Sequence, residues 1–374
     1  MKNVVFSLFF LLSVSVSAQI HLFPVEIKGK SGYMDQMGKM VIPATYDLAE
    51  DFKEGLAVVA LSNMPCVINE KNERVVDTGI FQFIGNYSEG IFPARDFHHQ
   101  TFYINSKGEK IISLSDSIYE ARSFHNGLAC ISKQVEDHTF KFNRDIVTLG
   151  YRFGFIDKTG KLAISFIYED ADDFENGVTR VKLKNKFGLI NTKGETILNA
   201  EFGNIGKFYE EKAWFEKNGK YGYLGLNGKI IIEPKFDYAF DFSDGLAGVW
   251  DAATKKFGYI NEKGEVKIKI EFDRVHPFSE GKAAVLTNGK WGFINKEGKM
   301  IIMNNFDNAG MFEEGMCAVL VKRKWGFIND SGRLAVPADF DAVGSFTNGV
   351  ADVVYHGVKL YVDKNGNVLP KLKD

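Results

Sequence analysis

The chain has 374 residues, is 45% hydrophobic and carries a formal net charge of −2, so it can build a large core. Lys and Arg are scattered without forming a basic stripe, which argues against a nucleic-acid-binding surface. Aromatic residues are abundant, with 33 Phe and 14 Tyr, whereas there are only 8 Pro, a combination that favours β-strands over disorder or a coiled coil.

Residues 1–18 have the pattern of a secretory signal. Lys2 supplies the positive start, the run VVFSLFFLLSVSV is apolar, and Val16-Ser17-Ala18 forms a small-residue cleavage site before Gln19. The apolar run is shorter than the roughly 20 residues that span a bilayer. We therefore expect cleavage near Ala18–Gln19 and a secreted, periplasmic or extracellular mature chain, 19–374, that is not membrane-spanning.

An aromatic–glycine pair recurs along the rest of the chain. From Gly154 onward successive glycines of this pair are 34 or 36 residues apart. The glycines are Gly32, Gly154, Gly188, Gly222, Gly258, Gly292 and Gly326. Two degraded copies place Cys66 and Phe102 in the glycine position, and a partial copy begins at Leu360. A fixed period of this length is the signature of a repeat architecture.

One unit, NGKWGFINKEGKMII at 288–302, shows the local structure that each copy predicts. Asn288-Gly289 between two apolar runs is a strong hairpin signal. Asn295 and Gly298 then predict a second turn, after which residues 300–302 return as a third strand. The segment 306–315 crosses to the next unit and is expected to hold a short fourth strand. The fold class is therefore all-β, built from antiparallel meanders of about 34 residues, with no helix of useful length.

The stretches KWGFIN, KFGLIN, KYGYLG and KFGYIN, each followed by a glycine turn, resemble the WG (KWG) repeat family of bacterial proteins over residues 31–369. We divide this region into nine units from about residue 31 to 353 and a partial capping unit at 354–374. Residues 133–150 are an insertion, and insertions in repeat arrays project from one face, which is often the binding face. The resemblance implies a surface or envelope binding module. A looser similarity connects the chain with aromatic hairpin repeats that bind cell-wall glycans or choline.

Two architectures fit such a repeat. A closed β-propeller typically has 4–8 blades of about 40 residues or more, whereas this chain offers nine shorter units and a partial one. An open array tolerates degraded end copies because they cap the stack. We therefore expect tandem repeats stacked into an open curved array, with the closed propeller as the alternative.

The sequence contains no motif of a catalytic, cofactor or metal site. It lacks the phosphate-binding GxxxxGK[ST], the GxSxG turn and HExxH. His98 and His99 are adjacent, so on a strand they would face opposite sides. DKNGN at 363–367 aligns with the repeat's glycine turn and not with a calcium loop. Carboxylates recur at the same place in several units, which is typical of a solvated rim. We predict no enzyme, no cofactor and no metal.

Aromatic residues give the candidate binding sites. Trp291 and Trp325 occupy one position in successive copies, for which core packing is the favoured interpretation and a stacking platform the alternative. Trp214 and Trp250 lie outside that position, and isolated tryptophans are favoured binding anchors. We predict a binding or scaffolding module for a protein or cell-envelope surface partner, with glycan binding as the alternative and no nucleic-acid partner.

The chain has only three cysteines, Cys66, Cys130 and Cys317, too few and too odd in number for a disulfide framework. Cys317 takes the place that Ala holds in most other copies, which indicates a packed position. We expect all three thiols to be free and mostly buried.

Overall fold

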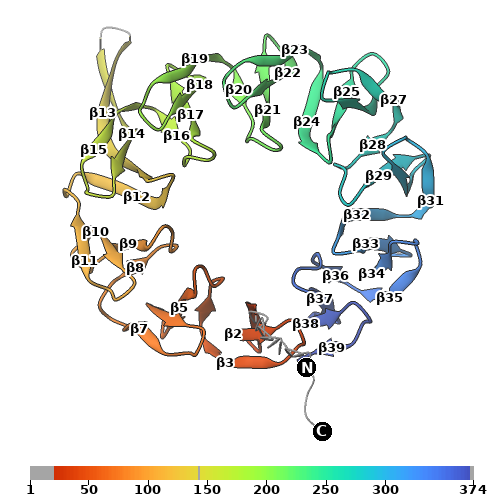
Figure 1. The fold of residues 1–374 in the computed structure, drawn as a ribbon, viewed down its shortest axis with the longest axis horizontal. Helices are drawn as coiled ribbons and strands as arrows, with labels where there is room; N and C mark the ends of the chain where they lie inside the picture. The colour runs from red at the N-terminus through yellow and green to blue at the C-terminus, as the bar shows by residue number, and fades with distance from the viewer. Residues whose placement is uncertain (1–20, 142–143, 371–374) are drawn as a thin grey trace, which may run out of the picture.

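The computed structural model describes residues 21–141 and 144–370, and the predicted signal segment therefore lies outside the described residues. The described chain forms 39 strands, which confirms the prediction of an all-β fold. The strands are arranged in ten antiparallel sheets, called blades here, that follow one another around a central opening (Figure 1). Blade 1 holds β1–β3, and each later blade holds the next four strands in order, from β4–β7 in blade 2 to β36–β39 in blade 10.

Within blades 2 to 10 the chain runs from the central opening outward (Figure 1). The innermost strands are β4 (Leu48–Ala49), β8 (Phe83–Ile84), β12 (Ile118–His125), β16 (Asp170–Ala171), β20 (Asn204–Ile205), β24 (Tyr238–Ser243), β28 (Arg274–Val275), β32 (Asn308–Glu313) and β36 (Ala342–Val343). The second strands are β5 (Leu56–Leu61), β9 (Ile91–Arg95), β13 (Leu128–Lys141), β17 (Val178–Leu183), β21 (Lys212–Lys217), β25 (Leu246–Asp251), β29 (Lys282–Thr287), β33 (Met316–Val321) and β37 (Val350–Tyr355). In blade 1 the strand that corresponds to them is β1 (Leu22–Ile27), and its β2 and β3 correspond to the third and outer strands.

The third strands carry the glycine of the repeat in seven blades and its degraded copies in three, and the outer strands face away from the opening. The third strands are β2 (Lys30–Asp35), β6 (Met64–Asn69), β10 (Thr101–Asn105), β14 (Arg144–Asp157), β18 (Lys186–Asn191), β22 (Lys220–Gly225), β26 (Lys256–Asn261), β30 (Lys290–Asn295), β34 (Lys324–Asn329) and β38 (Val358–Asp363). The outer strands are β3 (Met40–Tyr46), β7 (Arg74–Val76), β11 (Lys110–Ser113), β15 (Leu162–Tyr168), β19 (Thr196–Phe202), β23 (Ile230–Phe236), β27 (Val266–Phe272), β31 (Met300–Phe306), β35 (Leu334–Phe340) and β39 (Val368–Leu369).

The glycine of the aromatic–glycine pair makes room for the outer strand. A Cβ on Gly292 would lie 2.7 Å from the carbonyl oxygen of Ile302 and 2.8 Å from the backbone nitrogen of Asn304. The pairing of β30 with β31 shifts register at this point, so the outer strand bulges over the glycine. All seven blades that keep this glycine have an outer strand of 7 residues. The three blades with Cys66, Phe102 or Leu360 there have outer strands of 3, 4 and 2 residues.

Polar residues of the repeat join each blade to the next. The lysine that begins a third strand binds an aspartate 17 positions later, in the next blade, at five junctions. The pairs are Lys30–Asp47, Lys220–Asp237, Lys256–Asp273, Lys290–Asp307 and Lys324–Asp341. The second carboxylate oxygen of Asp307 accepts a hydrogen bond from the backbone N–H of Lys322 at 2.8 Å, in the hairpin turn of its own blade. The recurrent acidic residues at these positions therefore hold the ring together.

The expectation of an open curved array is wrong, because blade 10 packs against blade 1 and closes the ring (Figure 1). The buried cluster at this junction contains Val25 and Met34 from blade 1 together with Val350, Tyr361 and Leu369 from blade 10. The C-terminal copy, expected to cap an open stack, thus supplies a blade with a short outer strand. Most innermost strands have only two residues, so ten narrow blades fit around an open centre.

The predicted insertion, residues 133–150, lengthens one hairpin. Strands β13 and β14 have 14 residues each and pair without interruption from Leu128↔Asp157 to Lys141↔Arg144. This hairpin extends well beyond those of the other blades (Figure 1). The inner strand of the same blade, β12, is also the longest of the inner strands, with 8 residues.

Candidate functional site

The innermost wall of the ring is where the repeats differ most from one another. In the second strand, one position is occupied by a small residue in nearly every copy. The residue directly after it faces the inner strands of its own blade and of the next blade. In blades 2 to 10 this residue is Val58, Pro93, Cys130, Arg180, Trp214, Gly248, Ala284, Ala318 and Asp352. A position that an architecture requires keeps its residue type from copy to copy, as the glycine under the outer strand does. The variable inner positions are therefore the better candidates for a function particular to this chain.

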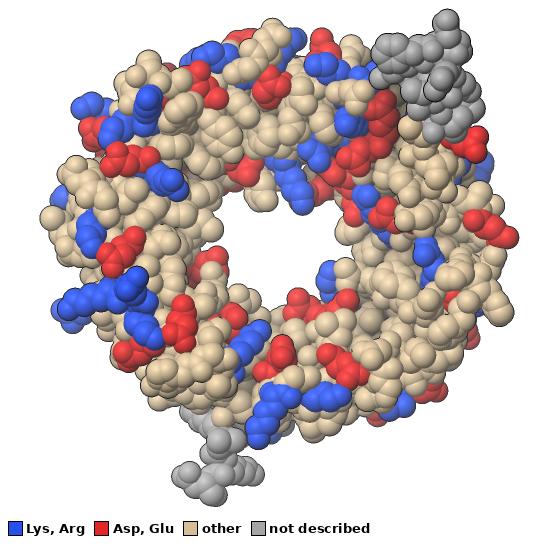
Figure 2. Space-filling model, turned by 180° about the vertical axis from the view of Figure 1, so that it is seen from behind, with Lys and Arg blue, Asp and Glu red and all other residues tan. Residues whose placement is uncertain are grey.

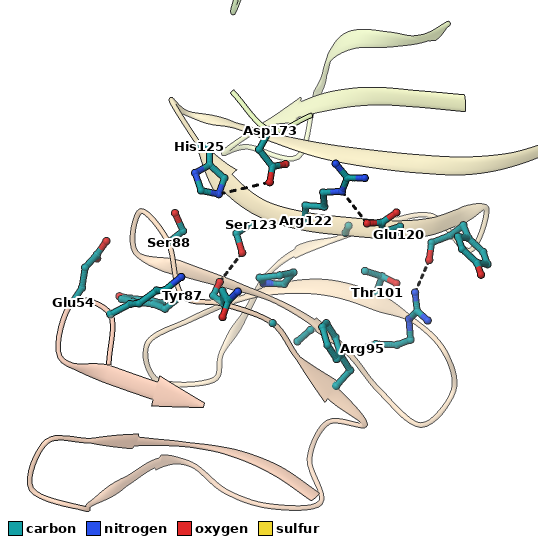
Figure 3. Close-up of a pocket in the computed structure, with 18 residues that line it drawn as sticks. Glu54, Tyr87, Ser88, Arg95, Thr101, Glu120, Arg122, Ser123, His125 and Asp173 are labelled. Carbon is teal, nitrogen blue, oxygen red and sulfur yellow. Dashed lines mark hydrogen bonds and ion pairs between the residues drawn. The ribbon is translucent and has the colours of Figure 1, made fainter. Parts of the chain in front are cut away.

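A cavity on this wall lies between blades 3 and 4 (Figure 3). Its volume is about 740 Å³, and its lining includes residues of the inner strands β8 and β12. Figure 3 shows Glu54 and Tyr87 toward one end of the cavity and Arg95, Thr101 and Glu120 toward the other. At this place the two-residue strand β8 and the eight-residue strand β12 both contribute to the wall.

Two aromatic side chains of the lining are exposed. Phe83 is 53% exposed and Tyr119 is 55% exposed, and both belong to innermost strands. Tyr119 is held in place because its ring lies 4.6 Å from that of Tyr151 and its carbonyl oxygen accepts a hydrogen bond from Arg95 Nη2 at 2.6 Å. Phe83 is the β8 residue paired with Arg95. Arg95 therefore links the strands that carry the two rings.

Polar side chains in the lining have unused hydrogen-bonding capacity. Thr101 Oγ1 and Asp173 Oδ1 are buried atoms without a hydrogen-bond partner in the described structure. Burial raises the pKa of Asp173, while the positive charges of Arg122 and His125 act in the opposite direction. Asp173 Oδ2 lies 3.9 Å from His125 Nε2. Buried polar atoms are nearly always paired in proteins, so these two are candidates to bind a ligand group.

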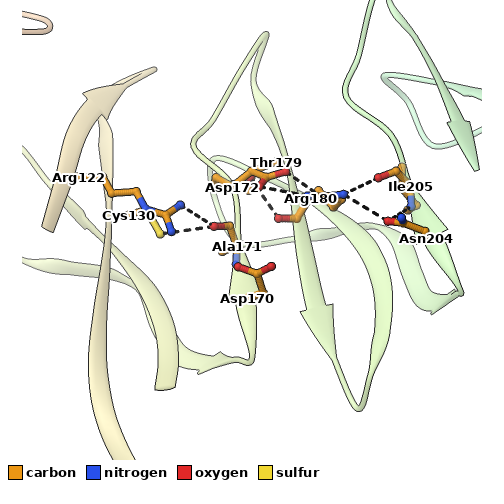
Figure 4. A network of polar contacts seen from close by, with 9 residues as sticks. All are labelled: Arg122, Cys130, Asp170, Ala171, Asp172, Thr179, Arg180, Asn204 and Ile205. Carbon is orange, nitrogen blue, oxygen red and sulfur yellow. Dashed lines mark hydrogen bonds and ion pairs between the residues drawn. The ribbon is translucent and has the colours of Figure 1, made fainter. Parts of the chain in front are cut away.

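Arginines extend this polar wall into the next two blades (Figure 4). Arg122 binds the Glu120 carboxylate at 2.9 Å and donates to the carbonyl oxygen of Ala171, in blade 5, at 2.8 Å. Arg180 binds Asp172 at 2.9 Å and donates to the carbonyl oxygen of Ile205, in blade 6, at 2.6 Å. A second cavity, of about 600 Å³, lies beside Arg180 and shares Arg122, His125 and Asp173 with the first. These arginines fix the inner strands of neighbouring blades as walls of both cavities.

The four predicted binding tryptophans lie on blades 6 to 9 and do not line these two cavities, although Trp214 packs on Gly206, which lines the second. Trp291 is 7% exposed and stacks on His276, with ring centroids 4.7 Å apart, so it is part of the core. Trp325 is partly buried opposite Phe340.

Trp214 and Trp250 are both partly buried and lie on different blades. Trp214 covers Gly206, where a Cβ would approach its indole nitrogen to 2.4 Å, and its indole hydrogen-bonds to Asp241, an interaction that opposes the rise in the pKa of Asp241 caused by burial. Trp250 is paired with Tyr238, and its ring lies 6.4 Å from that of Phe257. The structure does not bring these tryptophans together, and their binding role stays a prediction.

Other predicted features have structural places. The three cysteines are free and buried, as predicted. His98 and His99 lie in the turn before β10, where the backbone N–H of His98 donates to Asp96. Among residues 21–141 and 144–370 no group of three or more His, Cys, Asp or Glu could hold a metal ion. Within the same ranges no helix is long and apolar enough to cross a membrane.

Charges of both signs surround the central opening (Figure 2). Viewed from behind, acidic side chains gather between the opening and the grey atoms of the long hairpin. Sequence reasoning treated Asp173 as one carboxylate of a solvated rim and did not single out Phe83 or Tyr119. Departure from the repeat could have pointed to Tyr119, because most other copies have an acidic residue at its position.

Comparison with known proteins agrees with the repeat. The family model described as "WG containing repeat" matches residues 32–63, 153–187, 187–221, 221–249, 257–291, 291–325 and 325–357. These matches begin at or next to the seven copies that keep the glycine under the outer strand. No curated protein matches the chain.

Of three solved structures similar to this chain, the first one given shares the overall fold at low sequence identity. A crystal structure of a eukaryotic initiation factor is 12% identical, with a TM-score of 0.52, covering 94% of this chain and 95% of that chain. The computationally designed Ika8 protein is 10% identical, with a TM-score of 0.34, over 76% of this chain and 94% of that one. The extracellular domain of the putative hybrid two component system BT3049 from B. thetaiotaomicron is 8% identical, with a TM-score of 0.30, over 94% of this chain and 56% of that one.

The family matches cover more than half of the chain and recur in the period that the blades repeat. The chain belongs to the WG containing repeat family.

Proposed function

We propose that this protein is a non-catalytic binding module and that the cavity between blades 3 and 4 takes a short glycan. The observation that carries the proposal is the pair of exposed rings, Phe83 and Tyr119, beside the unpaired polar atoms Thr101 Oγ1 and Asp173 Oδ1. A sugar ring offers an apolar face for stacking and hydroxyl groups at its edge. The cavity volume of about 740 Å³ is within the usual range of small-ligand sites.

The ionisable side chains that line the cavity favour ligand binding without catalysis. The Glu120 carboxylate is paired with Arg122, and Asp173 lies beside His125. A glycosidase needs one free carboxylic acid and one free carboxylate on either side of the bond to be cleaved. Because the Glu120 carboxylate is occupied by its ion pair with Arg122, it is not free to act on a bound sugar.

We further propose that the protein acts outside the cytoplasm, where the predicted signal at 1–18 would send it. The aromatic and hydroxyl-rich cavity suits an envelope glycan, which agrees with the surface role that the family resemblance implies. A protein partner is the second candidate. It is favoured by a separate observation: among the described residues, no strand pairs with the inner edge of β1 in blade 1.

The test is a binding screen of the exported protein against envelope oligosaccharides, followed by calorimetry on the best ligand. We expect Phe83→Ala and Tyr119→Ala each to weaken binding about tenfold or more, since loss of a stacking contact at a binding anchor commonly costs more than 1 kcal/mol. Tyr209→Ala is the matched control, because Tyr209 is 48% exposed but lies on blade 6, away from the cavity.

Binding that is unchanged in the Phe83 and Tyr119 variants but lost in Trp214→Ala or Trp250→Ala would move the site to the tryptophans. Release of reducing sugar from the bound ligand would contradict a non-catalytic role. Circular dichroism of each variant separates loss of binding from loss of fold.

A further inference from the structure

Blade 1 differs from the other nine blades in its inner edge. Blades 2 to 10 each have an innermost strand paired with the second strand, whereas blade 1 consists of β1, β2 and β3. Strand β1 is the counterpart of the second strands, because Val25 pairs with Gly32 as Val319 pairs with Gly326. Among the described residues no strand pairs with the other edge of β1, the edge that faces the central opening.

The nine inner strands of blades 2 to 10 show which side chains a strand paired with this edge carries. In blade 9, Ala309 of β32 pairs with Val319, and Phe312 pairs with Cys317. All nine have a small or aliphatic residue followed three positions later by an aromatic ring. The aliphatic residues are Ala49, Ile84, Ala121, Ala171, Ile205, Ala239, Val275, Ala309 and Val343. The aromatic residues are Phe52, Tyr87, Phe124, Phe174, Phe208, Phe242, Phe278, Phe312 and Phe346.

The aromatic ring of each such strand packs on the preceding blade. Phe312 lies 5.1 Å from Phe293 of blade 8, and Phe52 lies 4.6 Å from Tyr33 of blade 1. Tyr361 is the corresponding residue of blade 10. In blade 1, the hydroxyl of Tyr33 donates to a carbonyl oxygen of the next inner strand segment, that of Glu50. The hydroxyl of Tyr361 instead accepts from the backbone N–H of Glu26, on β1 itself.

A cavity of about 290 Å³ lies at this junction. Its lining includes Phe23 and Pro24 of β1, Asp352 and Tyr361 of blade 10, and Asp51 of blade 2. In other blades the backbone oxygens equivalent to those of Glu26 and Pro24 accept hydrogen bonds from the inner segment, as Leu320 accepts from Asp307 and Asp352 from Gly344. The inner edge of β1 thus offers backbone hydrogen-bond acceptors at the spacing that a paired β-strand requires.

The residues that precede β1 in the chain do not have the sequence of an inner strand. In the register of the repeat, Ser15 corresponds to the aliphatic position and Ala18 to the aromatic position. The signal prediction also removes both residues from the mature chain. A segment from another polypeptide can supply the missing aromatic ring.

We propose that blade 1 binds an extended segment of a partner protein by β-strand addition. The segment pairs with β1 facing the central opening, places a small aliphatic residue opposite Val25, and places an aromatic residue, three positions later, beside Tyr361. Main-chain hydrogen bonds supply affinity and the two side-chain positions supply specificity, as in other strand-addition complexes. This proposal is independent of the glycan site, because it rests on the edge of β1 and its tests leave Phe83 and Tyr119 unchanged.

The test uses the peptide DAVGSFTN, which copies residues 341–348, with fluorescence anisotropy on the exported protein. We expect saturable binding that weakens tenfold or more when the peptide carries Phe346→Ala. We expect no binding when it carries Gly344→Pro, since proline removes the backbone N–H that in blade 10 donates to the carbonyl oxygen of Asp352.

A variant in which the same chain supplies the inner strand of blade 1 completes the test. Replacing Ile20 and His21 by DAVGSFTNG, with the signal segment intact, gives blade 1 its own inner strand. We expect this variant to be exported, to melt at a higher temperature and to lose peptide binding. The proposal is overturned if the exported protein shows no saturable binding, if the proline peptide binds as well as the parent, or if the filled variant binds the peptide unchanged.

Discussion

The hydroxyl of Tyr361 accepts a hydrogen bond from the backbone N–H of Glu26 at 2.9 Å, joining residues 335 positions apart. The same junction contains a tight contact in which a Cβ at Gly38 would lie 2.3 Å from the Leu369 side chain. This second contact repeats inside the ring, where a Cβ at Gly332 would lie 2.9 Å from Ile302. Ring closure therefore uses an interface of the same type as the interfaces between consecutive blades.

Leu369→Ala should destabilise the protein about as much as Ile302→Ala. Both side chains are buried against a turn glycine of the next blade, at 4% and 8% exposure. Removal of a buried Leu or Ile side chain typically costs about 2–5 kcal/mol. Urea unfolding of the two variants measures the comparison. A neutral Leu369→Ala beside a costly Ile302→Ala would show that the ring is open in solution.

The aromatic–glycine pair should tolerate no side chain at its glycine. Gly292→Ala forces a Cβ to within 2.7 Å of the Ile302 carbonyl oxygen, so we expect a loss of about 1–3 kcal/mol from overpacking. Gly310→Ala is the matched control, because its Cβ would meet nothing closer than Ala318 at 3.7 Å. Thermal melting of both variants checks this, and equal stability of the two would contradict the architectural role of the pair.

The sequence was sufficient to predict the strands because each copy repeats the same local signals. The Asn288-Gly289 turn, the alternation around Trp291 and the glycine at Gly298 all specify structure within about fifteen residues. Closure was not predictable in this way. It depends on the small angle between neighbouring blades, which follows from how two-residue inner strands pack, and no single copy contains that information. The preference for 4–8 blades then favoured the wrong architecture.

The candidate site was less predictable than the fold. Tryptophans were chosen because they are large and rare, but Trp291 is buried beside His276. The cavity residues Phe83 and Tyr119 lie on inner strands, and which exposed residues of these strands line a cavity depends on the neighbouring blade. The acidic periodicity was interpreted as a solvated rim, and Asp307 is exposed, but it also binds Lys290 and a turn amide. Such partners lie in a neighbouring blade or across a turn and are not visible in the pattern.

The three thiols should be unreactive in the folded protein. Burial raises the pKa of Cys130 and of Cys317 to about 12 and raises that of Cys66. Because the thiolate is the reactive form, we expect no alkylation in native buffer at pH 8 and complete labelling in denaturant. Mass spectrometry without reduction reads both results. A mass two protons lower, with two thiols missing in denaturant, would reveal a disulfide.

Asp307 should contribute to stability at neutral pH and lose that contribution in acid. The bond to Lys290, together with the Lys322 amide, holds the pKa of Asp307 below its usual value. The ionised form is therefore favoured by folding, so its contribution is present above the unfolded pKa of about 3.9 and is lost as pH falls through the folded pKa. We expect Asp307→Asn to melt below the wild type at pH 7 and the difference to vanish toward pH 2. Lys290→Met should reproduce this profile, and a difference independent of pH in either variant would contradict it.

Asp173, in the cavity wall, should show the opposite pH dependence. Burial raises its pKa, and the nearby Arg122 and His125 only partly oppose this effect. Folding therefore favours the protonated acid. The folded state holds more protons than the unfolded state between the unfolded pKa of about 3.9 and the raised folded value, so the buried carboxylate lowers the free energy of unfolding increasingly as pH rises through that window.

Replacing the Asp173 acid by an amide of the same shape removes the titration. We expect the melting temperature of Asp173→Asn, relative to wild type, to increase from pH 3 to pH 7, whereas that of Asp307→Asn decreases over the same range. Parallel profiles for the two variants would show that burial does not govern Asp173 and would remove the support that its environment gives to the cavity as a ligand site.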